Sequence, residues 1–220
     1  MRIPLAVVAL LLATATASAQ TSVGLKVGFN VAGISFDDDV ENAPEESVID
    51  TSPRLGFAAG VFADIALTPA LTFHPEVLYS QKGITRALRA APTSGGVTQQ
   101  IDYVEAPILL SLRAPAVLNG LVFGIEAGPT FAYKVRTSIR CTGRYQEVCD
   151  SADAQQSAAD GFGDYDLGAA LGVTVGTGPV HIGARFTQGI MTTDDPESQT
   201  EPSGARNHAF SLAAHYTFGG

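Results

Sequence analysis

The stretch that most restricts the fold of this chain runs from Arg54 to Gly83. Apolar residues alternate with polar or small ones along it in two runs, which the turn-forming sequence Thr68-Pro69-Ala70 joins. Alternation with a period of two over more than ten residues predicts two long strands in a hairpin. Strands of soluble sheets usually contain about five or six residues, whereas a tilted strand that crosses a membrane needs about 9–11. The hairpin therefore favours a transmembrane sheet.

The same alternation recurs along the rest of the chain. Including the two strands of the hairpin, it predicts eight strands, of which the others cover residues 23–31, 100–113, 121–135, 164–176, 180–190 and a final segment that ends at Phe218. The connections between them alternate between long and short, and the long ones are expected at residues 37–53, 86–98, 136–163 and after residue 190. This arrangement predicts an all-β fold, an eight-stranded antiparallel transmembrane barrel with short periplasmic turns and long extracellular loops.

Three segments also carry a family resemblance. The opening GLKVGFNVAGIS (residues 24–35), the hairpin and the segment DYVEAPILLSLR (residues 102–113) resemble the bacterial outer-membrane β-barrel domain family that includes the PorT-like proteins. The resemblance extends over essentially the whole chain after its first residues. It implies the barrel fold and the outer membrane as location, and through the family's "porin" label it implies a transport role. PorT-like relatives imply a role in protein secretion.

The amino-terminal segment predicts export. A basic Met1-Arg2 precedes an apolar run from Ile3 to Ala13, and Ala17-Ser18-Ala19 forms a small-residue cleavage site before Gln20. This pattern is typical of a secretory signal peptide, so we expect residues 1–19 to be removed and residues 20–220 to form the barrel domain. The alternative, an amino-terminal membrane anchor, is disfavoured because the apolar run is short.

The net charge and the two cysteines limit which ligands and partners the protein is expected to bind. The net charge of −9 disfavours nucleic acid, since nothing would offset repulsion by phosphates. The two cysteines, Cys141 and Cys149, lie eight residues apart in a polar stretch. In an exported protein such a pair predicts a disulfide, and without a nearby histidine it makes a poor metal site.

The placement of charges decides between this fold and a soluble barrel of the lipocalin type, which would hide its apolar faces. Charged residues lie on the faces opposite the apolar ones and alternate there with glycines, as expected for a narrow interior. The apolar faces should then contact outer-membrane lipids, because a basic side chain at mid-bilayer costs about 2–4 kcal/mol. The charges predicted to form a paired network in the lumen are Lys26, Arg54, Asp64, Glu76, Lys82, Glu105, Arg113, Glu126, Lys134, Asp166 and Arg185.

Catalytic and metal sites have little support in the sequence. His74, His181 and His215 fall on the interior faces, and a hydrolase triad of Ser211, His181 and Glu76 is conceivable, yet no G-x-S-x-G motif accompanies it. No two of the histidines have metal-ligand spacing on one strand. The acidic loop at residues 37–53 lacks the calcium-binding D-x-[DN]-x-[DN]-G pattern. We therefore expect no enzyme activity and no cofactor.

The sequence thus predicts a non-enzymatic, monomeric outer-membrane protein with a lumen filled by side chains. Its role would be in envelope structure or in surface interaction, with an envelope or extracellular partner bound through the outer loops. The disulfide loop CTGRYQEVC is either a recognition element, since a staple reduces the entropy lost on binding, or protection for an exposed loop. A porin-like or secretion-associated transport role and a lipid-modifying enzyme are the alternatives.

Overall fold

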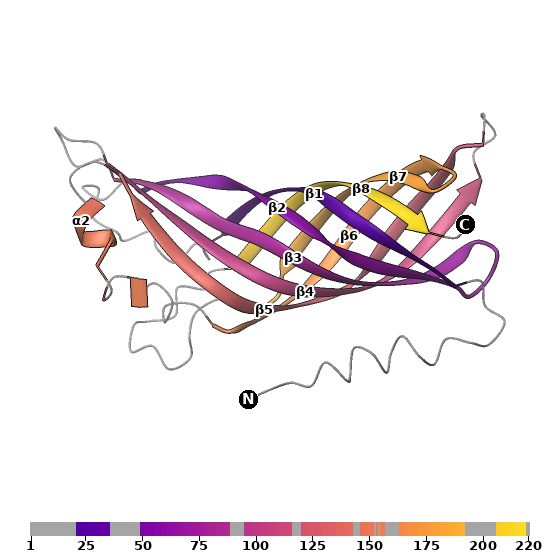
Figure 1. Cartoon of the computed structure of the whole chain (residues 1–220), viewed down its shortest axis with the longest axis horizontal. Coiled ribbons are helices and arrows are strands. Elements are labelled where there is room, and N and C mark those ends of the chain that lie inside the picture. Colours follow the sequence, from indigo (N-terminus) through magenta and orange to yellow (C-terminus); the bar gives the residue numbers. More distant parts are fainter. Residues whose placement is uncertain are drawn as a thin grey trace.

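The chain forms a closed barrel of eight antiparallel strands in the computed structural model (Figure 1). The structure describes residues 21–35, 49–88, 95–115, 120–142, 146–151, 153, 155–156, 163–191 and 206–218. The predicted signal peptide and most of the acidic loop lie outside the described residues. Each strand pairs with its neighbours in sequence, and β1 pairs with β8 to close the barrel. This confirms the predicted all-β fold, a closed antiparallel barrel of eight strands.

The strands are long, as the alternation in the sequence predicts. They are β1 (Thr21–Ser35), β2 (Ile49–Ala66), β3 (Leu71–Leu88), β4 (Gly95–Pro115), β5 (Val122–Cys141), β6 (Tyr165–Thr177), β7 (Val180–Gly189) and β8 (Arg206–Phe218). The shortest has 10 residues and the longest 21. No helix in the described part of the chain is both long and apolar enough to span a membrane.

Tight turns join strands at one end of the barrel. Between β2 and β3, the Thr68 hydroxyl accepts hydrogen bonds from the backbone N–H groups of Ala70 and Leu71 at 3.3 and 3.0 Å. Between β6 and β7, Gly178 has a φ of +55°, which favours glycine. The end of β8 lies at this same end, and the short helix α2 (Gln146–Cys149) lies at the other (Figure 1).

At the end that carries α2, the strands reach further than the alternation predicts. β5 continues to Cys141, into the segment predicted as a loop from residue 136, and β3 and β4 also enter the predicted loop between them. Residues 137–141 pair with residues 97–101 of β4, beyond a bulge next to Tyr103. The prediction failed here because both segments are mostly polar, and their few apolar residues, Val97, Ile101 and Ile139, are too few to give a clear hydrophobic period.

The barrel is apolar outside and polar inside. Large apolar side chains such as Leu25, Val61, Leu110 and Leu171 are exposed by half or more of their surface. Their chain neighbours point into the lumen, where backbones and side chains crowd together. At Gly28, for example, a Cβ atom would collide with the Leu212 carbonyl oxygen and with Ala213. An outer surface of this kind is stable only in lipid.

Candidate functional site: the ion-paired lumen

The centre of the lumen is occupied by a cluster of fully buried charges around Glu76. Arg185 binds both carboxylate oxygens of Glu76 through Nη1 and Nη2, each at 2.7 Å. Lys26 Nζ binds the same carboxylate at 3.0 and 3.2 Å. Arg185 also contacts Glu126 Oε1, through Nε at 2.8 Å and Nη2 at 2.6 Å. Bidentate arginine–carboxylate pairs of this kind are among the strongest polar interactions in proteins.

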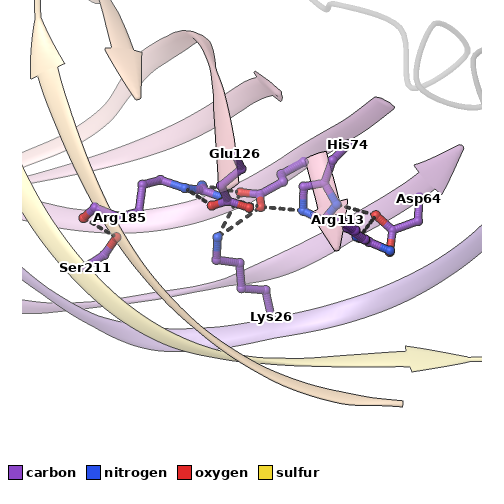
Figure 2. Close-up of polar contacts among 8 residues, drawn as sticks. Lys26, Asp64, His74, Arg113, Glu126, Arg185 and Ser211 are labelled. Carbon is purple, nitrogen blue, oxygen red and sulfur yellow. Dashed lines mark hydrogen bonds and ion pairs between the residues drawn. The ribbon is translucent and has the colours of Figure 1, made fainter. Parts of the chain in front are cut away.

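Further polar contacts lead from Glu76 toward the end of the barrel with the tight turns. His74 Nε2 lies 2.8 Å from Glu76 Oε1, and its Nδ1 lies 2.5 Å from Asp64 Oδ1. Arg113 Nη2 donates to the same Asp64 oxygen at 2.7 Å. Figure 2 shows this chain of side chains crossing the bore, with His74 between the Arg185 cluster and the Asp64–Arg113 pair.

The alternation of the strands explains why these groups meet. The contributing residues come from β1, β2, β3, β4, β5 and β7, and each has its side chain on the inner face of its strand. Lys26, Arg113 and Arg185 balance Asp64, Glu76 and Glu126 in formal charge. A buried charge is tolerated only when it is paired, and here every one of the six has a charged partner.

A separate group of contacts fills the lumen toward the end with α2. Lys82 Nζ lies 2.6 Å from Glu105 Oε1 and 5.5 Å from the centroid of the Tyr103 ring. Asn207 Nδ2 donates to Asp166 Oδ2 at 3.0 Å and to the Tyr103 hydroxyl at 3.3 Å. These groups are all less than a tenth exposed, so the bore is packed along much of its length.

The structure adds residues to the predicted set of lumen charges. Arg113 contacts Asp64, which was in the predicted set, and Lys134 contacts Asp164, which was not. Sequence reasoning gave His74 no part in the network and did not identify Asn207. The signal available for His74 was its position two residues before Glu76 on the same inner face of β3.

Arg54 is a correction to the predicted lumen set. The register of β2 against β3 shifts by one between Pro53 and Ala58, which marks a bulge. Arg54 Nη2 donates to Gln100 Oε1 at 2.6 Å, and Gln100 lies on the same face of β4 as the exposed Val104. The extra residue therefore turns the guanidinium to the outside of the barrel.

Two cavities in the described part of the lumen are each about the size of one water molecule. The larger of the two offers about 20 Å³ to water centres and is lined by Lys26, Ser80, Lys82, Glu105 and Arg185, among others. The second offers about 10 Å³, near His74, His181 and His215. One water needs roughly 10–15 Å³, so neither cavity has room for an organic ligand.

The conceivable triad is not assembled. The Ser211 hydroxyl donates to the Arg185 carbonyl oxygen at 3.4 Å, and Glu76 is occupied by Lys26, His74 and Arg185. Among the described residues, no hydrogen bond joins Ser211, His181 and Glu76, and no group of three metal-ligating side chains is found.

The two cysteines form a disulfide that closes the loop after β5. Cys141 ends β5, Cys149 ends α2, and their Cα atoms lie 5.8 Å apart. Gln155 binds the strand beside the disulfide. Its side-chain amide donates to the carbonyl oxygens of Ile139 and Cys149 at 2.9 and 2.7 Å, and its oxygen accepts from the Ile139 N–H at 3.2 Å.

Replacing both cysteines by serine should leave the barrel folded, because its stability lies in the strand ladder and the lipid face. The closed loop is short, so the disulfide stabilises the folded conformation of this segment by roughly 2–3 kcal/mol. We expect faster hydrogen exchange at the Ile139 amide with unchanged heat-modifiable migration on gels. Loss of the folded gel band in the double serine variant would contradict this.

Comparisons with known proteins agree with the fold. Residues 17–195 match the family model described as the outer membrane protein beta-barrel domain. No curated protein is significantly similar in sequence. The solved structures that are similar include NspA, the Neisserial surface protein A (14% identity, TM-score 0.44), Ail of Yersinia pestis in complex with the heparin analogue sucrose octasulfate (12%, 0.37) and OprG of Pseudomonas aeruginosa (10%, 0.38). The matches cover 90% of this chain and 99%, 99% and 94% of the respective structures.

The matched model describes outer-membrane barrels in general, so the resemblance to PorT-like members stays a prediction. The family match covers most of the chain, and the closed barrel with its apolar outer face is independent of it. The chain therefore belongs to the outer membrane protein β-barrel domain family and is a protein of the bacterial outer membrane.

Proposed function

We propose that this protein is a closed, non-enzymatic barrel that serves envelope structure or surface interaction, and that it does not transport solutes through its lumen. The observation that carries the proposal is the cluster of Lys26, Glu76, Glu126 and Arg185, which crosses the bore and is nearly inaccessible to solvent. An eight-stranded barrel is only just wide enough for its own side chains. The paired side chains therefore leave little room for a solute to pass at this level of the bore.

The part of the molecule that remains for interaction is the end with α2. There β5 extends past its last pairing with β6 at Tyr133, and the disulfide and Gln155 hold the following segment against it. A pre-ordered segment loses less entropy when it binds a partner. This supports the recognition role of the disulfide loop over a purely protective one.

Purified protein in a planar bilayer should show no stable conductance, with at most small or flickering currents. A variant in which Lys26, Glu76, Glu126 and Arg185 are all replaced by alanine provides the matched comparison, because it removes the whole central cluster, two positive and two negative charges, and leaves the Asp64–Arg113 pair in place. If it folds, as judged by heat-modifiable migration, it should conduct more than the wild type. A large, steady current of a single size from the wild type would refute the closed barrel and support the porin alternative.

A lipid-modifying activity is the other alternative, and it has a separate test. Phospholipid hydrolysis and acyl transfer by the folded wild-type protein should not exceed those of a Ser211→Ala variant. A rate that depends on Ser211 would overturn the non-enzymatic proposal.

In cells, a strain that lacks the protein should take up small solutes normally and differ in surface binding or envelope integrity.

A further inference from the structure

Arginine side chains gather on the outside of the barrel, on the extended parts of β2 and β5. Arg136 and Arg140 are exposed and lie on either side of Ser138, which pairs with Gln100 of β4. Alternate residues of a strand point to the same face, so both arginines share the outer face with Gln100. Arg54, turned outward by the bulge in β2, binds Gln100 from the other side. These three arginines define the outer basic patch.

The patch carries a net positive charge in a protein whose total charge is −9. Arg140 is close enough to Arg54 to repel it, and Asp102 is close enough to attract it. Among the described residues, Asp102 is the carboxylate that these contacts place in the patch, and it is only 3% exposed. Three guanidinium groups and one buried carboxylate leave an excess of two positive charges. Such a concentration of like charge is unfavourable unless an anion shares it.

The height of the patch indicates which anion it meets. Directly below it, toward the middle of the barrel, lie outward-facing aromatic rings, with Phe57 5.6 Å from Tyr79 and Tyr133 5.2 Å from Tyr165 between ring centroids. Aromatic side chains of this kind mark the boundary between hydrocarbon and headgroups. On β5, Arg136 follows Tyr133 by three residues. The patch is therefore level with lipid headgroups, where phosphate is the abundant anion.

We infer that the outer basic patch binds the phosphate of a lipid headgroup in the outer leaflet, with Arg136 and Arg140 as the principal contacts. Arginine suits this task because its planar N–H groups match the oxygens of phosphate. Arg54 uses two of its N–H groups on Gln100 and on the Lys82 carbonyl oxygen, so it fixes the near side of the patch and adds charge. The lipid would lie along the aromatic side chains of β2, β3 and β5, with its headgroup between the arginines.

The test measures retention of phosphorylated lipid A by the full-length, folded protein in detergent, with native mass spectrometry as the readout. The wild type should retain it, and Arg136→Gln/Arg140→Gln should retain roughly tenfold less, since each basic residue near a charged surface contributes appreciably. The charge-preserving Arg136→Lys/Arg140→Lys should recover most of the retention. Lys134→Gln is the control for position, compared with the single variant Arg136→Gln, because each removes one positive charge from the same strand but Lys134 lies on the lumen side, where it contacts Asp164.

Two further measurements distinguish a lipid phosphate from free phosphate as the ligand. Lipid A without its phosphates should be retained poorly, and millimolar inorganic phosphate should compete weakly, because it lacks the acyl chains that contact the aromatic row. Equal retention by the wild type and the folded double glutamine variant, or equal retention of both forms of lipid A, would overturn the inference, and so would full displacement by inorganic phosphate. If the double variant fails to fold, retention by the wild type must fall steeply with added salt, and a salt-independent value would refute the site.

Discussion

Replacing Arg185 by leucine should lower the free energy of unfolding by about 3–5 kcal/mol, the largest effect expected for any single lumen residue. Arg185 contacts both Glu76 and Glu126. Its loss leaves Glu126 without its ion pair and Glu76 with fewer partners, in a space that is almost closed to water. Urea-induced unfolding of the purified protein in lipid vesicles, followed by heat-modifiable migration, measures the change.

The Arg185→Leu/Glu126→Leu double variant separates pairing from packing. It removes the stranded carboxylate together with the arginine, so part of the lost stability should return. Asp153→Leu, at an exposed position after α2, should change stability by less than 1 kcal/mol, as is usual for surface charges. If Arg185→Leu and Asp153→Leu have equal effects, the central cluster does not support the barrel.

Leu171→Arg should sharply reduce the amount of protein that inserts into the membrane. Leu171 lies in the middle of β6, faces outward and is 60% exposed, next to Ala127 and Phe186 of the neighbouring strands. A guanidinium at this depth costs about 2–4 kcal/mol relative to an apolar residue. The measurement is the fraction of heat-modifiable, membrane-inserted protein after expression or after refolding into vesicles.

Tyr165→Arg and Leu171→Ala are the matched controls. Tyr165 faces the same way at the start of the same strand, where the cost of a charge falls to about 0–1 kcal/mol, so its variant should insert nearly normally. Leu171→Ala removes the leucine without adding a charge and should also insert. Normal insertion of Leu171→Arg would mean that this face of β6 does not contact lipid.

The fold was predictable because the membrane imposes a simple pattern. A strand between lipid and a polar lumen must alternate with a period of two, as in the residues before and after Leu171. The side on which charges such as Glu76 and Arg185 lie followed from the same pattern. The disulfide between Cys141 and Cys149 followed from their spacing and from the predicted export.

The partners inside the lumen were not predictable, because they depend on how far each strand is shifted against its neighbours. That shift decides which carboxylate Arg113 meets, and in the structure it is Asp64. The outward turn of Arg54 depends on a single extra residue in β2, which leaves no mark in the hydrophobic pattern. The extension of β5 to Cys141 rests on backbone pairing between polar segments, and polar segments of strands and loops look alike in sequence.

The Glu76 cluster has a consequence for the order of assembly. Lys26 lies in the first strand and Arg185 in the next-to-last, while Glu76 and Glu126 lie in the middle of the chain. An open, unfinished sheet cannot bring all four together, because β1 and β8 have not yet met. The charges would stay hydrated until the seam joins, and their pairing would then favour the joined state. Ion pairing in the interior thus stabilises the closed barrel. A sheet that lacks its final strand would not have this stabilisation.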